Sequence, residues 1–268
     1  KAFADDEEAK DDLLSQRQDR EYHETLWDMY RTLIPVKYRE NITGFDLITD
    51  GYDGVVAHVM PSMDDPRDWL LSLDVLDSGV NLDEVMKTLI HETAHVLTIG
   101  HKQVPVDRKY LEAFDEEKDI SSYRNKCKTV FLKNGCARKT SYINQFYNEF
   151  WKPIEQEWTE KKVEESEEAQ IKFYKEKHDE FVSQYGTTNV AEDIADTFTA
   201  FILQDSKKVK EGSELKYKKV KSYEFVKEYL KYKKIAFFHQ FPELVKMRAE
   251  VLSGLYDVSK TIEQQSGD

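Results

Sequence analysis

Cysteine is scarce in this sequence, and its spacing excludes one common kind of metal site. Only two cysteines, Cys127 and Cys136, occur among the 268 residues. Two thiols at this separation do not match the short-spaced pairs of a Cys-based zinc site. With Asn134 and Gly135 between them they can instead close a small disulfide loop; two buried free thiols are the alternative. We favour the disulfide on condition that the protein is exported.

Long apolar runs and excess positive charge are also missing. No run approaches the length of a membrane span, so we expect no transmembrane segment. The 39 Lys and Arg residues against 52 Asp and Glu give a net charge of −13, which argues against a general nucleic-acid binder. The first residue is Lys1, and the acidic stretch that follows does not read as a signal peptide. We expect a mature or trimmed chain, so that any targeting or anchoring segment is lost to view, and the negative charge favours a secreted or surface protein.

Repeats, low-complexity tracts and clear linkers are absent from the sequence as well. The simplest organisation is one monomeric domain over residues 1–268. Within it we expect residues 101–184 to form a long insertion and residues 205–268 a helical C-terminal extension.

Hydrophobic periodicity predicts an α+β fold that is mostly helical. Apolar residues at helical spacing predict a helix within residues 5–40, ended by Pro35. Three β-prone runs, residues 42–49, 55–60 and 69–75, predict a small antiparallel sheet. The open edge of such a sheet can hold an extended peptide by strand addition.

The second half of the chain reads mainly as helix. Residues 101–125 predict loop with a short helix, and residues 126–180 predict charge-rich helices. An aromatic stripe over residues 142–154 is typical of core packing. Gly186 then predicts a break, and Asn189 an N-cap for a strongly apolar helix.

The most informative stretch is residues 91–95, which read H-E-T-A-H. On a helix, His91 and His95 lie four positions apart on one face, where two imidazoles can bind one Zn²⁺. Glu92 can then reach a water on the metal as general base. The alternative is a pair of core histidines beside a partly buried Glu, which would carry a desolvation cost of a few kcal/mol.

The residues around this motif predict a buried helix. Asn81 can cap it, a broad apolar stripe runs through it, and Gly100 can end it. His58, on the predicted second strand, is interpreted as a structural residue of the sheet.

Zinc needs a third protein ligand, and His101 is one candidate. It occupies the third-histidine position of the pattern H-E-x-x-H-x-x-G-x-x-H. The glycine position of that pattern is Thr98, a β-branched residue poorly suited to the positive φ of a sharp turn. No Met-turn follows the motif closely.

Glu192 is the other candidate. It lies in the first turn of the apolar helix, four positions before Asp196 on the same face. Such an acidic pair is explained either by the positive end of the helix dipole or by a metal. Asp196 can hydrogen-bond a ring nitrogen of His91 or His95 and fix its tautomer.

The motif taken together with residues 185–192, which read Y-G-T-T-N-V-A-E, resembles the gluzincins, the zincins whose third ligand is Glu. In particular it is similar to toxin-type metallopeptidases such as the catalytic domain of anthrax lethal factor. The resemblance implies that His91, His95 and Glu192 bind zinc and that Glu92 is the general base. It also implies that Tyr185 assists the transition state.

The sequence departs from that family in the 97 positions that separate His95 from Glu192. An insertion of this size can form a lid or a substrate platform, so the substrate class does not carry over. We expect a zinc-dependent metalloendopeptidase that acts on a peptide or protein. The alternatives are a zinc-containing binding module with little turnover, a metzincin-like protease that uses His101, and a structural protein without metal.

Overall fold

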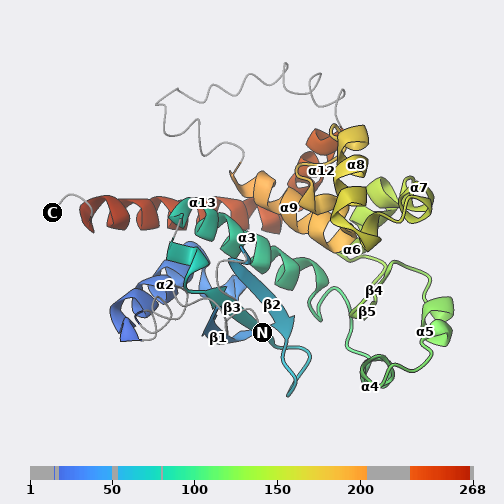
Figure 1. The fold of residues 1–268 in the computed structure, drawn as a ribbon, viewed down its shortest axis with the longest axis horizontal. Coiled ribbons are helices and arrows are strands. Elements are labelled where there is room, and N and C mark those ends of the chain that lie inside the picture. Colours follow the sequence, from blue (N-terminus) through green and yellow to red (C-terminus); the bar gives the residue numbers. More distant parts are fainter. Residues whose placement is uncertain (1–14, 16–17, 50–53, 80, 204–229, 266–268) are drawn as a thin grey trace. The chain divides into compact units, whose positions relative to one another are not determined.

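The structure, a computed structural model, describes residues 15, 18–49, 54–79, 81–203 and 230–265 (Figure 1). The chain divides into two compact units, each described by itself. The first consists of residues 1–96 and 246–268, and the second of residues 97–245. The expected insertion, residues 101–184, falls within the second unit, and its status as an insertion in a single domain stays a prediction.

The first unit contains the predicted three strands and the motif helix. Its elements are α2 (Arg20–Leu33), η2 (Val36–Tyr38), β1 (Ile42–Ile48), β2 (Ala57–Pro61), β3 (Trp69–Asp74), η3 (Asp77–Gly79), α3 (Leu82–Ile99) and the greater part of α13 (Pro242–Gln265). The strands agree with the predicted runs to within two residues. Of the helix expected within residues 5–40, α2 is the described part, and it ends before Pro35 as predicted.

The sheet has the spatial order β1-β3-β2, and it is mixed where the sequence predicts an antiparallel one. Strands β2 and β3 are antiparallel, whereas β1 and β3 are parallel. The chain reverses direction after β1 and again after β2, so β1 and β3 run the same way. Strand β3 is buried at all but one position and takes the centre of the sheet, so β1 lies directly beside it as a parallel neighbour.

Helices α2 and α13 pack closely in this unit. A Cβ added to Gly254 of α13 would lie 2.3 Å from the backbone oxygen of Thr32, so only glycine allows this approach. Lys37 and Glu250 form an ion pair of 2.7 Å beside it. These contacts attach the last helix to the first half of the chain.

The second unit is almost entirely helical, which confirms the mostly helical α+β class. Its elements are α4 (Arg108–Asp115), α5 (Ser121–Lys126), β4 (Phe131–Leu132), β5 (Gly135–Cys136), α6 (Tyr142–Phe146), η4 (Tyr147–Trp151), α7 (Glu155–Glu160), η5 (Val163–Glu165), α8 (Glu167–Lys177), η6 (Tyr185–Thr187), α9 (Val190–Leu203), α12 (Leu230–Phe237) and η7 (Phe238–Gln240). None of the described helices is long and apolar enough to cross a membrane.

A hairpin replaces the beginning of the helical region expected over residues 126–180. Strands β4 and β5 pair antiparallel, and the disulfide between Cys127 and Cys136 closes them with a Cα–Cα distance of 5.6 Å. Gly135 has a φ of 117°, which helices exclude. The expected disulfide is confirmed, and the helix expected at this point is wrong because the Asn-Gly turn dominates.

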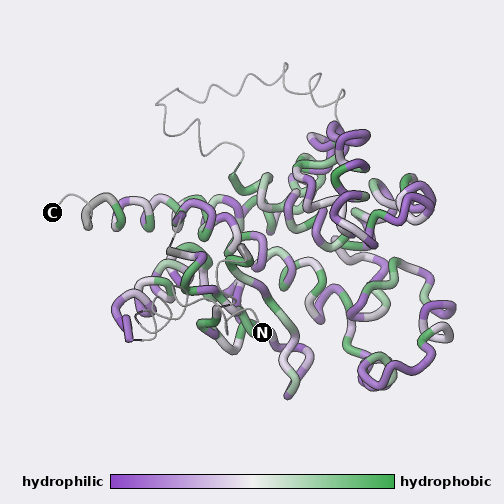
Figure 2. The backbone as a smooth tube through the Cα atoms, viewed as in Figure 1, coloured by the Kyte–Doolittle hydropathy of each residue, from purple (hydrophilic) through white to green (hydrophobic). Residues whose placement is uncertain are grey.

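The aromatic stripe forms the core of this unit, as predicted. Phe146 and Phe150 are buried and pack edge to face with a centroid distance of 4.9 Å. Both also contact Phe237 of α12. By contrast, Figure 2 shows that the segment of α4 and α5 is largely hydrophilic.

Candidate metal centre

Helix α3 carries the motif and begins as the sequence predicts. The Asn81 side-chain oxygen accepts hydrogen bonds from the backbone N–H groups of Asp83 and Glu84, at 3.0 and 3.4 Å. The helix continues to Ile99 and ends before Gly100. The middle of its apolar stripe is buried, at Val85, Met86, Leu89, Ile90 and Ala94, so residues 91–95 lie in the interior of a regular, packed helix.

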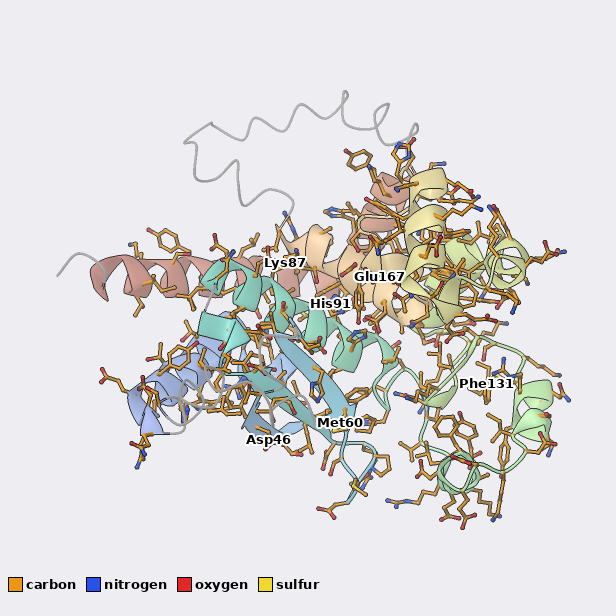
Figure 3. All side chains as sticks on the ribbon, in the orientation of Figure 1. Asp46, Met60, Lys87, His91, Phe131 and Glu167 are labelled. Carbon is orange, nitrogen blue, oxygen red and sulfur yellow. A yellow bond between two sulfur atoms is a disulfide. The ribbon has the colours of Figure 1, made fainter. Side chains whose placement is uncertain are left out.

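The three motif residues converge. His91, Glu92 and His95 are each 8% exposed, and one ligand atom from each lies within 4.8 Å of the others. The two imidazole rings meet nearly at right angles, with centroids 4.7 Å apart. Figure 3 labels His91 on α3. Two imidazoles and a carboxylate in so small a buried space fit the nitrogen and oxygen ligands that Zn²⁺ prefers.

Strand β2 fixes the carboxylate of Glu92. The backbone N–H of Val59 donates to Glu92 Oε2 at 2.9 Å. This bond joins the edge of the sheet to the motif helix, and it orients the expected base by a backbone N–H, which every residue except proline supplies. Nothing in the spacing of the sequence predicted this partner.

The register of the sheet explains why Val59 is available. In the antiparallel ladder, Ser62 N–H donates to Asp68 and Asp74 N–H donates to Val56, at 2.8 and 2.9 Å. Backbone groups alternate between the two sides of a strand, so those of Val59 face away from β3. Those of Ala57 and Pro61 face the same way. In the part of the chain that the structure describes, β2 pairs with β3 alone and this side is an open edge.

The second unit carries the other expected site residues. Asn189 caps α9 as predicted, because its side-chain oxygen accepts from the backbone N–H groups of Ala191 and Glu192 at 2.9 and 3.1 Å. Glu192 is half-buried in the first turn. Asp196 accepts a hydrogen bond from the Ser183 hydroxyl. Tyr185 is 57% exposed. The roles of Tyr185, Glu192 and Asp196 toward a metal stay predictions.

Glu192, His101 and His58 all lie outside the group of ligand atoms that converges among the described residues. Thr98 is buried inside α3, which continues in helical conformation to Ile99. The sharp turn of the metzincin pattern is therefore not formed at the position of its glycine. His58 lies half-buried on β2.

The buried ion pair of Asp193 and Lys234, next to Glu192 in sequence, was not predicted from the sequence. Asp193 Oδ2 accepts from Lys234 Nζ and from Trp151 Nε1, both at 2.6 Å, and both charged side chains are 0% exposed. Lys234 Nζ also lies 3.7 Å from the centre of the Phe181 ring. Burial raises the pKa of Asp193 and lowers that of Lys234. The available signal was an Asp on an otherwise apolar helix and a Lys directly before the apolar run of residues 235–238.

Comparison with known proteins adds no relative: no family model, curated protein or solved structure matches the chain significantly.

Proposed function

We propose that the protein is a zinc-dependent peptidase of the gluzincin type. The observation that carries this proposal is the buried convergence of His91, Glu92 and His95, with Glu92 held by the edge strand of the sheet. His91 and His95 would hold the metal. A catalytic zinc ion, when bound, lowers the pKa of its water and polarises a carbonyl oxygen.

Glu92 would act as the proton carrier. As a carboxylate it can accept a proton from the attacking water and deliver it to the leaving amine. The bond from Val59 N–H restricts how the carboxylate can rotate, and such preorganisation lowers the cost of reaching the reactive geometry. Burial of Glu92 at 8% exposure keeps bulk water from competing for that proton.

The open edge of β2 would hold the substrate. The outward carbonyl oxygens of Ala57, Val59 and Pro61 and the N–H of Ala57 can pair with an extended peptide as an added strand, whereas Pro61 has no N–H and that of Val59 binds Glu92. Because Val59 lies on this edge and also bonds Glu92, a peptide bound there would pass close to the proposed base. Figure 3 labels Met60, one of the exposed residues of this strand.

Glu192 completes the proposed ligand set, with Asp196 orienting a ligand histidine and Tyr185 donating to the oxyanion. The support is the likeness of residues 185–192 to the gluzincin pattern together with the confirmed helix that begins after Asn189. The uninterrupted helix at Thr98 favours Glu192 over His101. The disulfide supports the proposed export, since disulfides persist in oxidising compartments.

Zinc content should identify the third ligand. We expect one zinc per chain in the wild type and in His101→Ala, and a loss of zinc in Glu192→Ala, because a site with two protein ligands binds zinc poorly. Elemental analysis of the purified proteins measures this, with the exposed Glu149→Ala as control for removing a carboxylate. Zinc kept in Glu192→Ala but lost in His101→Ala would assign the site to the metzincin pattern. A wild type without zinc would overturn the proposed function.

Tyr185→Phe should lower kcat for peptide hydrolysis by about 10- to 1000-fold, because one hydrogen-bond donor to the oxyanion is removed. Zinc content and KM should change little. Tyr256→Phe is a matched control, since both tyrosines are 57% exposed. Full activity of Tyr185→Phe would show that this residue has no part in the chemistry.

A further inference from the structure

One long stretch of this acidic protein carries positive charge and no negative charge. Residues 120–148 contain no Asp or Glu, although the whole chain has a net charge of −13. They contain six cations, which lie on α5, on the disulfide-closed hairpin and directly after it. We call these six residues the basic hairpin surface: Arg124, Lys126, Lys128, Lys133, Arg138 and Lys139.

All six cations are exposed, and none forms an ion pair with a described residue. Some exposed lysines elsewhere are paired, as Lys87 is with Glu84 and Lys162 with Glu165, at 3.2 and 3.0 Å, whereas residues 120–148 offer no acidic partner in their own stretch of sequence. Six like charges within residues 124–139 and no acidic residue among them give this stretch an excess of positive charge, which an anionic partner would neutralise.

The backbone that carries these cations is held in place. The disulfide closes the hairpin, and Tyr110 donates from its hydroxyl to the backbone oxygen of Lys133 at 2.9 Å. Asn144 accepts from the backbone N–H of Val130 at 3.1 Å. The guanidinium of Arg124 lies 5.2 Å from the centre of the Phe131 ring, which Figure 3 labels. A partner would therefore meet a preorganised surface.

A cavity of about 240 Å³ adjoins this surface and includes Arg138 in its wall. The Arg138 Nε donates to the backbone oxygen of Lys102 at 3.0 Å, which fixes the guanidinium. The one acidic side chain in the wall, Glu243, accepts a hydrogen bond from the Tyr142 hydroxyl at 2.7 Å. Burial and that carboxylate raise the pKa of Tyr142, so its proton stays on this bond. The cavity can accommodate one acidic side chain beside Arg138.

We propose that the basic hairpin surface binds an acidic segment of a polypeptide. If the protein is the peptidase proposed above, that polypeptide is its substrate. This identification of the partner rests on the proposed function. None of the described residues that are large, apolar and exposed falls within residues 120–148. The surface therefore lacks both an apolar anchor for a lipid bilayer and an exposed ring on which a nucleic-acid base could stack.

Binding can be measured without turnover in the full chain carrying Glu92→Gln. The probe is a fluorescein-labelled oligoglutamate of about ten residues, with oligoglutamine of equal length as control, followed by fluorescence anisotropy. Reversing three cations, in Lys126→Glu/Lys128→Glu/Lys133→Glu, should weaken oligoglutamate binding about tenfold or more. The matched control reverses three exposed lysines outside the surface, in Lys152→Glu/Lys172→Glu/Lys175→Glu, and should weaken it much less.

Equal weakening in the two triple variants would overturn the proposal, because net charge alone would then explain binding. So would preferential binding of oligothymidylate or of phosphatidylserine vesicles that depends on the same three lysines. Circular dichroism should show that both variants keep their helix content. A wild type that binds oligoglutamate but hydrolyses no peptide would refute the proposed peptidase function. The proposal that the basic hairpin surface binds an acidic segment would still hold.

Discussion

Glu92→Gln should reduce peptide hydrolysis by about 10²- to 10⁴-fold while the zinc content stays at the wild-type level. The amide has nearly the shape of the carboxylate and can still accept the bond from Val59 N–H, so the local structure is kept. It cannot take a proton from water, and that function is worth about this factor. Hydrolysis of a quenched fluorescent casein and elemental analysis of the same sample measure the two quantities.

The control for this variant is Glu84→Gln on the same helix. Glu84 is exposed and pairs with Lys87 at 3.2 Å, so its loss should leave hydrolysis unchanged. Because the potential ligand atoms of three residues converge, the same samples also test whether Glu92 itself binds the metal. If Glu92→Gln lost zinc together with activity, Glu92 would be a ligand of the metal and the proposed division of roles would be wrong. Full activity of Glu92→Gln would refute the role of general base.

Lys234→Met should lower the free energy of unfolding by about 3–5 kcal/mol, the usual cost of leaving a buried charge without its partner. Asp193 would keep only the indole N–H of Trp151 and a longer contact of 3.4 Å from the Thr197 hydroxyl. Both charged side chains are 0% exposed, so water cannot replace the missing ammonium. Urea unfolding followed by circular dichroism measures the change.

Lys233→Met is the matched control, since this neighbour is exposed and its substitution should change the unfolding free energy by no more than about 0.5 kcal/mol. The double variant Asp193→Leu/Lys234→Met removes both charges and should recover much of the loss. Unchanged stability of Lys234→Met would show that the pair is not closed in solution. Because Asp193 directly follows Glu192, zinc content of the same variants tests whether the pair also positions the proposed ligand.

Local features of the fold could be predicted because neighbouring residues determine them. Asn81 and Asn189 each have a short side chain that satisfies the first N–H groups of a helix, and both cap as predicted. The apolar period of α3 placed His91 and His95 on one face, since helix geometry alone fixes that relation. The Cys pair closed around an Asn-Gly turn for the same local reason.

Relations between distant residues required the folded chain. The order of the three strands depends on which strand buries both faces, and periodicity within one strand does not report its neighbours. The bond from Val59 to Glu92 spans 33 positions and depends on the register of β2, in which a shift by one residue would turn the N–H toward β3. The pair of Asp193 and Lys234 spans 41 positions.

The sequence by itself determined the helix that bears the H-E-T-A-H motif, the caps of α3 and α9, the three strands and the disulfide. Only the tertiary structure decided the parallel pairing of β1 with β3, the backbone partner of Glu92 and the burial of Lys234. The physical reason is the range of the interactions. Caps, helical faces and tight turns depend on residues a few positions apart, whereas sheet order and buried ion pairs depend on which distant surfaces exclude water together.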